Sequence, residues 1–182
     1  MGLRGILEDL IGSGKIRWYG WSTDLVDRAR AFAEGEHCTS IQFALNALAD
    51  NPEMRQLCAD FDLAGINKDP LHRGMLTGKF TPATAFPGND IRSETDYRSA
   101  RMVRRLETVE ALRELLTSGG RSMAQGALAY IWALDPRMIP IPGFKSLAQV
   151  RENTAAMDFG PLDPQTMGEI QAIVAERQPM AG

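Results

Sequence analysis

Apolar residues recur along this chain at two different spacings. Apolar positions three or four residues apart predict amphipathic helices over residues 3–11, 25–33, 52–61, 103–116 and 122–134. Short runs rich in β-branched, aromatic and other apolar residues predict strands over residues 16–21, 40–45, 63–67 and 138–141. A further helix is expected from Ser146, and an amphipathic last helix after Asp163 and Pro164. Strands that alternate with helices in this way are typical of parallel β/α units.

Capping residues mark the starts of several predicted helices. Asn51 followed by Pro52 offers an N-cap and a first-turn proline. Two further pairs, Ser122 with Gln125 and Ser146 with Gln149, have the spacing of a capping box. Helices are therefore expected to begin directly after Asn51, Ser122 and Ser146.

Two layouts fit four parallel β/α units: part of a (β/α)₈ barrel, or a small open doubly wound sheet. A glycine-rich dinucleotide fingerprint would favour the open sheet, but Gly12 and Gly14 precede a strand rather than follow one, and Arg17 replaces the third glycine. The stretch 74–80 resembles a phosphate-binding P-loop but is one residue too short, and Phe80 replaces the serine or threonine that would bind Mg²⁺.

Composition narrows the class of protein. The 182 residues predict one domain over 1–182, with a long loop over 81–98 of the kind that often acts as a lid. A net charge of −3, with basic residues spread along the chain, gives no indication of a nucleic-acid partner. Cys38 and Cys58 lack metal-ligand spacing, so we expect buried reduced thiols in a cytoplasmic protein and no metal site. No apolar run is long enough to span a membrane.

The stretch 138–153 predicts an anion-binding site. A short apolar run ends in Pro142 and Gly143, and a helix begins directly after it. The free N–H groups of a first helical turn and the helix dipole favour negative charge, and Lys145 adds a positive charge at the same place, with Arg151 as a second candidate. The alternative interpretation is a capped surface helix that carries scattered basic residues.

This segment, from Ile139 to Asn153, resembles the cofactor signature at the last strand and helix of the aldo/keto reductase family. Residues 14–22, 41–46 and 70–79 are similar to the segments at the family's fifth and sixth strands and to the loop after its seventh strand. The resemblance implies an α/β fold, namely a partial TIM (β/α)₈ barrel of about four parallel β/α units plus a C-terminal helix. It also implies that NADP(H) is the cofactor.

The resemblance assigns cofactor contacts to particular residues. Ser22 and Gln42 are expected near the nicotinamide carboxamide, and the loop after the seventh strand near the pyrophosphate through Gly74, Leu76 and Lys79. The last loop and helix would bind the 2′-phosphate and adenine through Gly143, Phe144, Lys145, Ser146, Gln149, Arg151 and Asn153. Each role has an alternative: Gln149 could complete a cap, Lys79 could be a solvated loop residue, and Gln42 could satisfy a strand end.

Lys68 marks a local departure from the family. Many members carry an aromatic residue at the end of the seventh strand to stack on the nicotinamide, and some carry a basic one. Here Lys68 stands at that place, with Asp69 after it, so a cofactor contact is expected from Lys68 but a stacking contact is not.

The family's catalytic tetrad, an Asp, a Tyr, a Lys and a His, comes from its first four β/α units, which this chain does not match. Neither His37 nor His72 stands at a position that resembles the catalytic histidine. No catalytic residue is therefore assigned. Half a barrel would be a truncated product of a full reductase, would pair with a second copy or with a separate N-terminal half, or would rearrange into a small open sheet.

Three functions remain. The first is the NADP(H)-binding C-terminal portion of an aldo/keto reductase-like oxidoreductase, inactive alone, and its partners would be the dinucleotide and a second copy or N-terminal half. The second is a catalytically dead nucleotide-binding or oligomerisation module. The third is an unrelated small α/β protein that binds another phosphorylated ligand.

Overall fold

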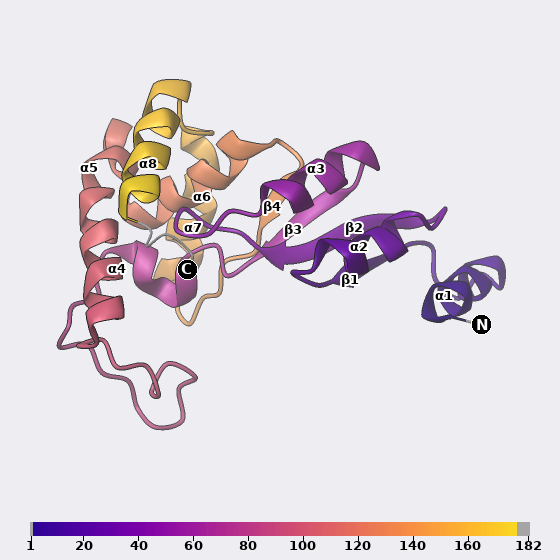
Figure 1. The fold of residues 1–182 in the computed structure, drawn as a ribbon, viewed down its shortest axis with the longest axis horizontal. Helices are drawn as coiled ribbons and strands as arrows, with labels where there is room; N and C mark the ends of the chain where they lie inside the picture. Colours follow the sequence, from indigo (N-terminus) through magenta and orange to yellow (C-terminus); the bar gives the residue numbers. More distant parts are fainter. Residues whose placement is uncertain (1, 178–182) are drawn as a thin grey trace.

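The computed structural model describes residues 2–177, and residues 1 and 178–182 of the domain predicted over 1–182 lie outside the described part (Figure 1). Four strands form one sheet: β1 (Tyr19–Ser22), β2 (Cys38–Ala44), β3 (Ala64–Lys68) and β4 (Met138–Pro140). The helices are α1 (Leu3–Gly12), α2 (Val26–Ala33), α3 (Pro52–Asp60), η1 (His72–Thr77), α4 (Ala100–Ala111), α5 (Arg113–Leu116), η2 (Ser118–Gly120), α6 (Met123–Leu134), α7 (Leu147–Phe159) and α8 (Pro164–Arg177).

The strand order of the sheet is β1-β2-β3-β4, and every neighbouring pair is parallel. Crossovers between parallel strands are right-handed, so a sheet that grows in one direction carries all its crossover helices on one face. The contacts agree with this arrangement, because α2 packs on β1 and β2, α3 on β2 and β3, and α6 on β4. A doubly wound sheet would place helices on both faces, so the topology favours the barrel-type layout.

Burial alternates along the strands because only one face of the sheet is covered. On β2, Ile41 and Phe43 are fully buried against the helices, while Ser40 and Gln42 on the opposite face are partly exposed. Strands of a parallel sheet covered on both faces are buried throughout. The uncovered face also carries Ile139 of β4, which is 50% exposed, and it corresponds to the interior face of a barrel.

The expected helix starts are confirmed at Asn51 and Ser122. The Asn51 side chain accepts a hydrogen bond from the N–H of Met54 (3.1 Å) at the start of α3. At α6 the capping box is reciprocal, since Ser122 Oγ accepts from the N–H of Gln125 and Gln125 Oε1 accepts from the N–H of Ser122. These caps satisfy N–H groups that have no partner inside the helix.

Some predicted boundaries are wrong. The first strand begins at Tyr19 rather than at residue 16, because Lys15–Trp18 connects α1 to the sheet outside the ladder. The single helix predicted over 103–116 is divided into α4 and α5 at Leu112, whose N–H is shared between the carbonyls of Thr108 and Val109 (both 3.2 Å). The Thr108 hydroxyl donates to the Arg104 carbonyl (3.0 Å), and such back-bonding bends helices.

The molecule is elongated, with α4, α5, α6 and α8 gathered at one end of the sheet and α1 at the other (Figure 1). Glu8 attaches α1 to the sheet, because its carboxylate accepts from the hydroxyl of Tyr19 (2.6 Å) and lies 2.7 Å from His37 Nδ1. Cys38 and Cys58 are buried and free, as expected. Within residues 2–177, no helix combines the length and the apolar character that crossing a membrane requires.

Candidate functional site

The C-terminal edge of the sheet brings Ser22 and Gln42 into contact. The two residues are register partners on β1 and β2, and both face the uncovered side of the sheet. The Ser22 hydroxyl donates to Gln42 Oε1 (3.0 Å). The Gln42 oxygen is thus engaged, and its amide N–H groups are left to donate to a ligand carbonyl.

Lys68 ends β3 at the same edge, but its ammonium is already paired. Lys68 Nζ lies 2.9 Å from Asp24 Oδ2, and Asp24 Oδ1 accepts from the N–H of Ala44 (2.7 Å). Burial alone would raise the pKa of Asp24, but the hydrogen bonds from Ala44 and Lys68 outweigh it and lower the pKa. Asp24 therefore stays ionised. It holds the Lys68 side chain along the C-terminal edge of the sheet, from the end of β3 toward the end of β1.

Ser146 is the N-cap of α7, as predicted, but the capping box is incomplete. Ser146 Oγ accepts from the N–H of Gln149 (3.3 Å), whereas Gln149 Oε1 accepts from the N–H of Lys145 (2.6 Å) instead of that of Ser146. The reciprocal bond is shifted by one residue. The side chain of Gln149 thereby holds the backbone of Lys145 against the first turn of α7.

The ammonium of Lys145 projects from this helix start into solvent. Its side chain is 78% exposed, and Nζ lies 3.2 Å from Asp90 Oδ2. A lysine beside the free N–H groups of a helix N-terminus is a suitable place for an anionic ligand. Gly143 and Phe144 of the preceding loop are exposed, as is Arg151 on α7, while Asn153 is half-buried.

Asp90 and Arg92, in the segment between η1 and α4, form the other side of this region. Arg92 donates to Asp90 through Nε (2.8 Å) and Nη2 (2.6 Å), and these bonds, with a smaller contribution from Lys145, hold the pKa of Asp90 well below its usual range. The guanidinium of Arg92 also lies 3.8 Å from the ring centre of Phe86 and donates to the Arg73 carbonyl (3.3 Å). These contacts tie the long segment to η1 and to the start of α7.

The loop that carries Gly74, Leu76 and Lys79 has an unusual backbone. His72, Arg73 and Gly74 all have positive φ values (47°, 53° and 95°), which a non-glycine residue adopts only at a cost. The Asp69 carboxylate accepts from the N–H of Arg73 and helps to hold this shape. The side chain of Leu76 is fully buried, so only its backbone could face a ligand, whereas Lys79 is exposed.

Asp24, Asp90 and Arg92 were missed by sequence reasoning. Each acts through a contact with a residue distant in the chain, and their local spacing carries no motif. The one available signal was their position: Asp24 follows the end of a predicted strand, and Asp90 and Arg92 lie in a long loop of the kind that often covers a site. Within residues 2–177, no three His, Cys, Asp or Glu side chains are arranged to hold a metal ion.

The chain belongs to the aldo/keto reductase family, whose model matches residues 3–175. It is 26% identical over 175 residues to the aldo-keto reductase yakc [NADP(+)] of Schizosaccharomyces pombe, which is 93% of this chain and 51% of that protein. It is 26% identical over 156 residues to the NADH-specific methylglyoxal reductase of Escherichia coli, which is 85% of this chain and 48% of that protein. The chain thus spans about half the length of the curated relatives it matches.

Solved structures show the same fold. The glycerol dehydrogenase AKR11B4 from Gluconobacter oxydans matches with a TM-score of 0.80 at 25% identity, over 96% of this chain and 54% of that one. An aldo-keto reductase from Klebsiella pneumoniae in complex with NADPH matches with a TM-score of 0.66 at 20% identity, over 97% and 54% of the two chains. The four parallel β/α units are therefore a partial barrel of the aldo/keto reductase type.

Proposed function

We propose that this chain is the NADP(H)-binding portion of an aldo/keto reductase-like oxidoreductase that acts on carbonyl compounds. The observation that carries the proposal is the placement of Lys145, an exposed ammonium at the capped start of α7, at the strand-end side of a sheet that also presents Ser22 and Gln42. Active sites of (β/α)₈ enzymes lie at this end of the strands, with phosphate bound near the last two.

Within this proposal, each part of the cofactor meets a different element. The Gln42 amide, oriented by Ser22, donates to the nicotinamide carboxamide, and Lys68 lies beside it. The strained turn at Gly74, with the backbone of Leu76 and the ammonium of Lys79, follows the pyrophosphate. Lys145, Ser146 and Arg151 bind the 2′-phosphate, the loop of Gly143 and Phe144 adjoins it, and Gln149 and Asn153 reach the adenine. The loop over 81–98 closes over the dinucleotide.

Lys145 decides between NADPH and NADH. The two dinucleotides differ by the 2′-phosphate, and the names of the relatives include both an NADP(+) enzyme and an NADH-specific one. We expect Lys145→Ala to weaken NADPH binding by roughly tenfold and to leave NADH binding nearly unchanged, since one charge-assisted phosphate contact is lost. Fluorescence titration of the 182-residue chain measures both affinities. Lys15→Ala, an exposed lysine at the α1 end, is the matched control, and equal weakening of both dinucleotides would contradict the assignment.

Because residues 14–22, 41–46, 70–79 and 139–153 resemble the segments at the family's last four strands, we propose that this chain forms the C-terminal half of the barrel. The Asp, Tyr, Lys and His of the catalytic tetrad then belong to the N-terminal half of the barrel, and these 182 residues by themselves reduce no carbonyl compound. Two surfaces remain to be covered: the open face of the sheet, where Ile139 is half exposed, and the outer edges of β1 and β4. The N-terminal half of the barrel would cover them, and a second copy of this chain is the alternative.

A complementation assay tests the missing half. The 182-residue chain is mixed or co-expressed with the first four β/α units of the Gluconobacter glycerol dehydrogenase, and oxidation of NADPH is followed with an aldehyde substrate. Activity in the mixture and in neither component alone is the expected result. Cofactor binding without turnover under any pairing would instead indicate a catalytically dead nucleotide-binding module.

The free, buried thiols of Cys38 and Cys58 fit a reducing compartment, and we place the protein in the cytoplasm.

A further inference from the structure

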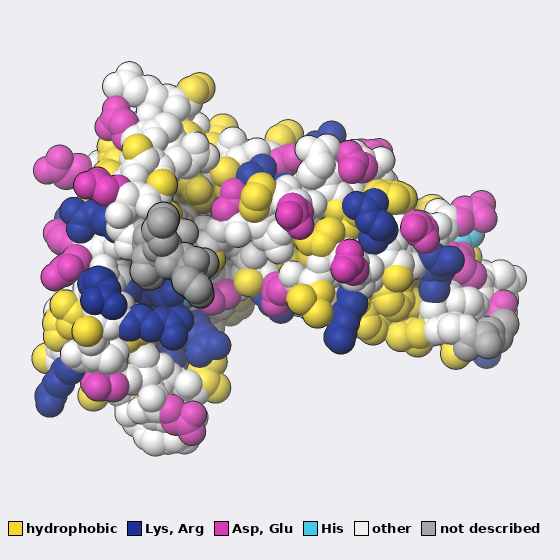
Figure 2. Space-filling model, in the orientation of Figure 1, with side chains coloured by type: hydrophobic (Ala, Val, Ile, Leu, Met, Phe, Trp, Pro, Cys, Tyr) yellow, Lys and Arg dark blue, Asp and Glu magenta, His cyan; other side chains and the backbone are white. Residues whose placement is uncertain are grey.

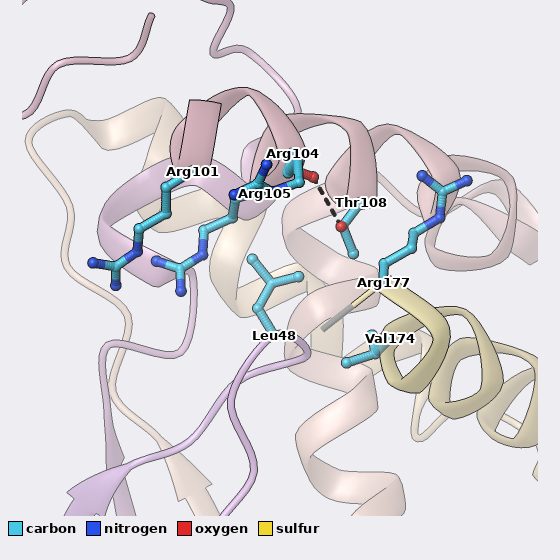
Figure 3. A pocket seen from close by; sticks show the side chains of 7 residues that line it. All are labelled: Leu48, Arg101, Arg104, Arg105, Thr108, Val174 and Arg177. Carbon is cyan, nitrogen blue, oxygen red and sulfur yellow. Dashed lines mark hydrogen bonds between the residues drawn. The ribbon is translucent and has the colours of Figure 1, made fainter. Parts of the chain in front are cut away.

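The fold places the end of α8 beside three arginines of α4. Arg101, Arg104 and Arg105 lie on α4 and Arg177 lies at the end of α8, and together with Leu48, Thr108 and Val174 they line a cavity of about 280 Å³. Figure 3 shows the side chains of Arg101 and Arg105 extended side by side from adjacent turns of α4, to one side of Leu48, whereas the guanidinium of Arg177 on α8 points away from this pair. Figure 2 shows Lys and Arg side chains gathered on the surface over and beside α4.

None of these four guanidinium groups has a carboxylate partner within residues 2–177. The ion pairs of residues 2–177 involve other arginines, lysines and the two histidines, and no acidic residue in that range lines the cavity. Arg105 is half-buried, and burial together with the charge of Arg101 lowers its pKa. Within residues 2–177, the positive charge in the cavity is therefore not compensated by a carboxylate.

The position of these arginines on α4 is unfavourable for the helix itself. Arg101 lies in the first turn, where the dipole disfavours cations, and it is three and four residues from Arg104 and Arg105, a spacing at which like charges repel each other. The first turn holds no acidic residue, and Glu110 pairs with Arg113 at the far end instead. A bound anion would relieve the repulsion among these three arginines.

One arginine is already held in place. Arg105 Nη1 lies 3.2 Å from His72 Nε2, and since a guanidinium can only donate, the histidine accepts this hydrogen bond. The Asn46 amide donates to the Asp69 carbonyl (3.0 Å) and lies 3.5 Å from His72 Nδ1. The cavity wall is thus organised without a ligand, as expected for a site that is largely pre-formed.

We propose that this cavity binds a small phosphorylated metabolite, at a site separate from the dinucleotide. Arginine binds phosphate through paired N–H donors, and several guanidinium groups suit a multiply charged anion. The volume lies near the lower end of the about 300–1,000 Å³ that ligand pockets span, and Leu48 and Val174 supply an apolar wall for a small carbon skeleton. None of the residues assigned to the dinucleotide lines this cavity.

Calorimetric titration of the 182-residue chain with pyrophosphate and with inorganic phosphate tests the proposal. One saturable site is expected, and R101Q/R104Q, which alters two exposed side chains on α4, weakens pyrophosphate by roughly tenfold or more. The matched control R28Q/R30Q removes the same charge from α2 and leaves the affinity unchanged. Circular dichroism confirms that both variants fold, and R105Q serves as a second variant inside the cavity.

Four results would overturn the proposal. The first is the absence of saturable pyrophosphate binding, and the second is an equal loss in R101Q/R104Q and R28Q/R30Q, which would indicate a non-specific charge effect. The third is a loss of pyrophosphate affinity in Lys145→Ala without such a loss in R101Q/R104Q, which would place the anion at α7. The fourth is tighter binding of a single-stranded oligonucleotide than of pyrophosphate, which would assign the arginines to nucleic-acid phosphates. Failure of NADPH binding alone leaves this site unaffected, so the two proposals fail separately.

Discussion

Lys145 Nζ lies 3.2 Å from Asp90 Oδ2, although the two residues are 55 positions apart in the chain. The contact joins the start of α7 to the long segment between η1 and α4. Asp90 is itself held by Arg92. Lys145, the residue predicted to bind the 2′-phosphate, therefore has a fixed carboxylate beside it. An anionic ligand at α7 must share Lys145 with Asp90 or displace it, which makes the position of this segment sensitive to occupation of the site.

The first prediction concerns the order of that segment. Asp90→Asn removes the negative charge that pairs with Arg92 and Lys145. We therefore expect amide hydrogen exchange over residues 88–93 to accelerate by roughly tenfold. Hydrogen–deuterium exchange with mass spectrometry measures the change. Glu110→Gln, which breaks an exposed ion pair with Arg113, is the control and leaves these amides unaffected. Unchanged protection in Asp90→Asn would show that the loop is held by other contacts.

The second prediction concerns the pair at the strand ends. Ser22→Ala and Gln42→Leu each remove one partner of a single hydrogen bond, and each is expected to weaken NADPH by about 1 kcal/mol, or roughly fivefold. Because Ser22 acts by orienting Gln42, the double variant should lose less than the sum of the two. Fluorescence titration of the four proteins completes the cycle, and strict additivity would mean that the two side chains act independently.

The third prediction is a pH dependence at Glu8. The Tyr19 hydroxyl, helped by His37 and opposed by burial, holds the pKa of Glu8 below its ordinary value. The stabilisation is therefore complete above the pKa of the unfolded chain and is lost as the pH falls through the lower folded pKa. We expect α1 to loosen from the sheet between about pH 5 and pH 3, seen in the NMR shifts of the α1 amides. The E8Q variant keeps an acceptor but cannot titrate, so the same transition in E8Q would exclude Glu8 as its cause.

The fourth prediction compares two glycines inside helices. A Cβ at Gly126 would lie 1.9 Å from the Leu116 carbonyl oxygen, whereas a Cβ at Gly168 would meet no atom within 4 Å. We expect Gly126→Ala to destabilise the protein by about 1–3 kcal/mol, since α5 and α6 must separate. Gly168→Ala should stabilise it by about 0.5–1 kcal/mol through helix propensity. The midpoints of urea unfolding of both variants and of the unchanged protein measure these differences. Similar stability of the two variants would contradict the close packing of α5 on α6.

The sequence predicts local features of the fold well, because their causes lie within a few residues. Asn51 followed by Pro52 defines the start of α3, and the Ser122–Gln125 box defines the start of α6. The Ser146–Gln149 box shows where this stops. Gln149 can bind the N–H of Ser146, three residues before it, or that of Lys145, four residues before it, and only the path of the loop after β4 selects Lys145.

The candidate site is harder to predict, because its polar contacts connect distant segments. Ser22 and Gln42 are 20 residues apart and meet because parallel register aligns β1 with β2. The pairing of Lys68 with Asp24, and the gathering of Arg101 and Arg177 around one cavity, depend on how the helices pack. A count of charges along the chain could not reveal either arrangement.

The match between strand order and chain order has a consequence for assembly. Each β/α unit adds to the sheet beside its predecessor, and within residues 2–177 the outer edges of β1 and β4 carry no neighbouring strand. Further units could therefore extend the ladder at either flank without threading through an existing connection. Such a molecule is suited to stepwise growth and to splitting between genes, since no crossover would need to be undone when the pieces join.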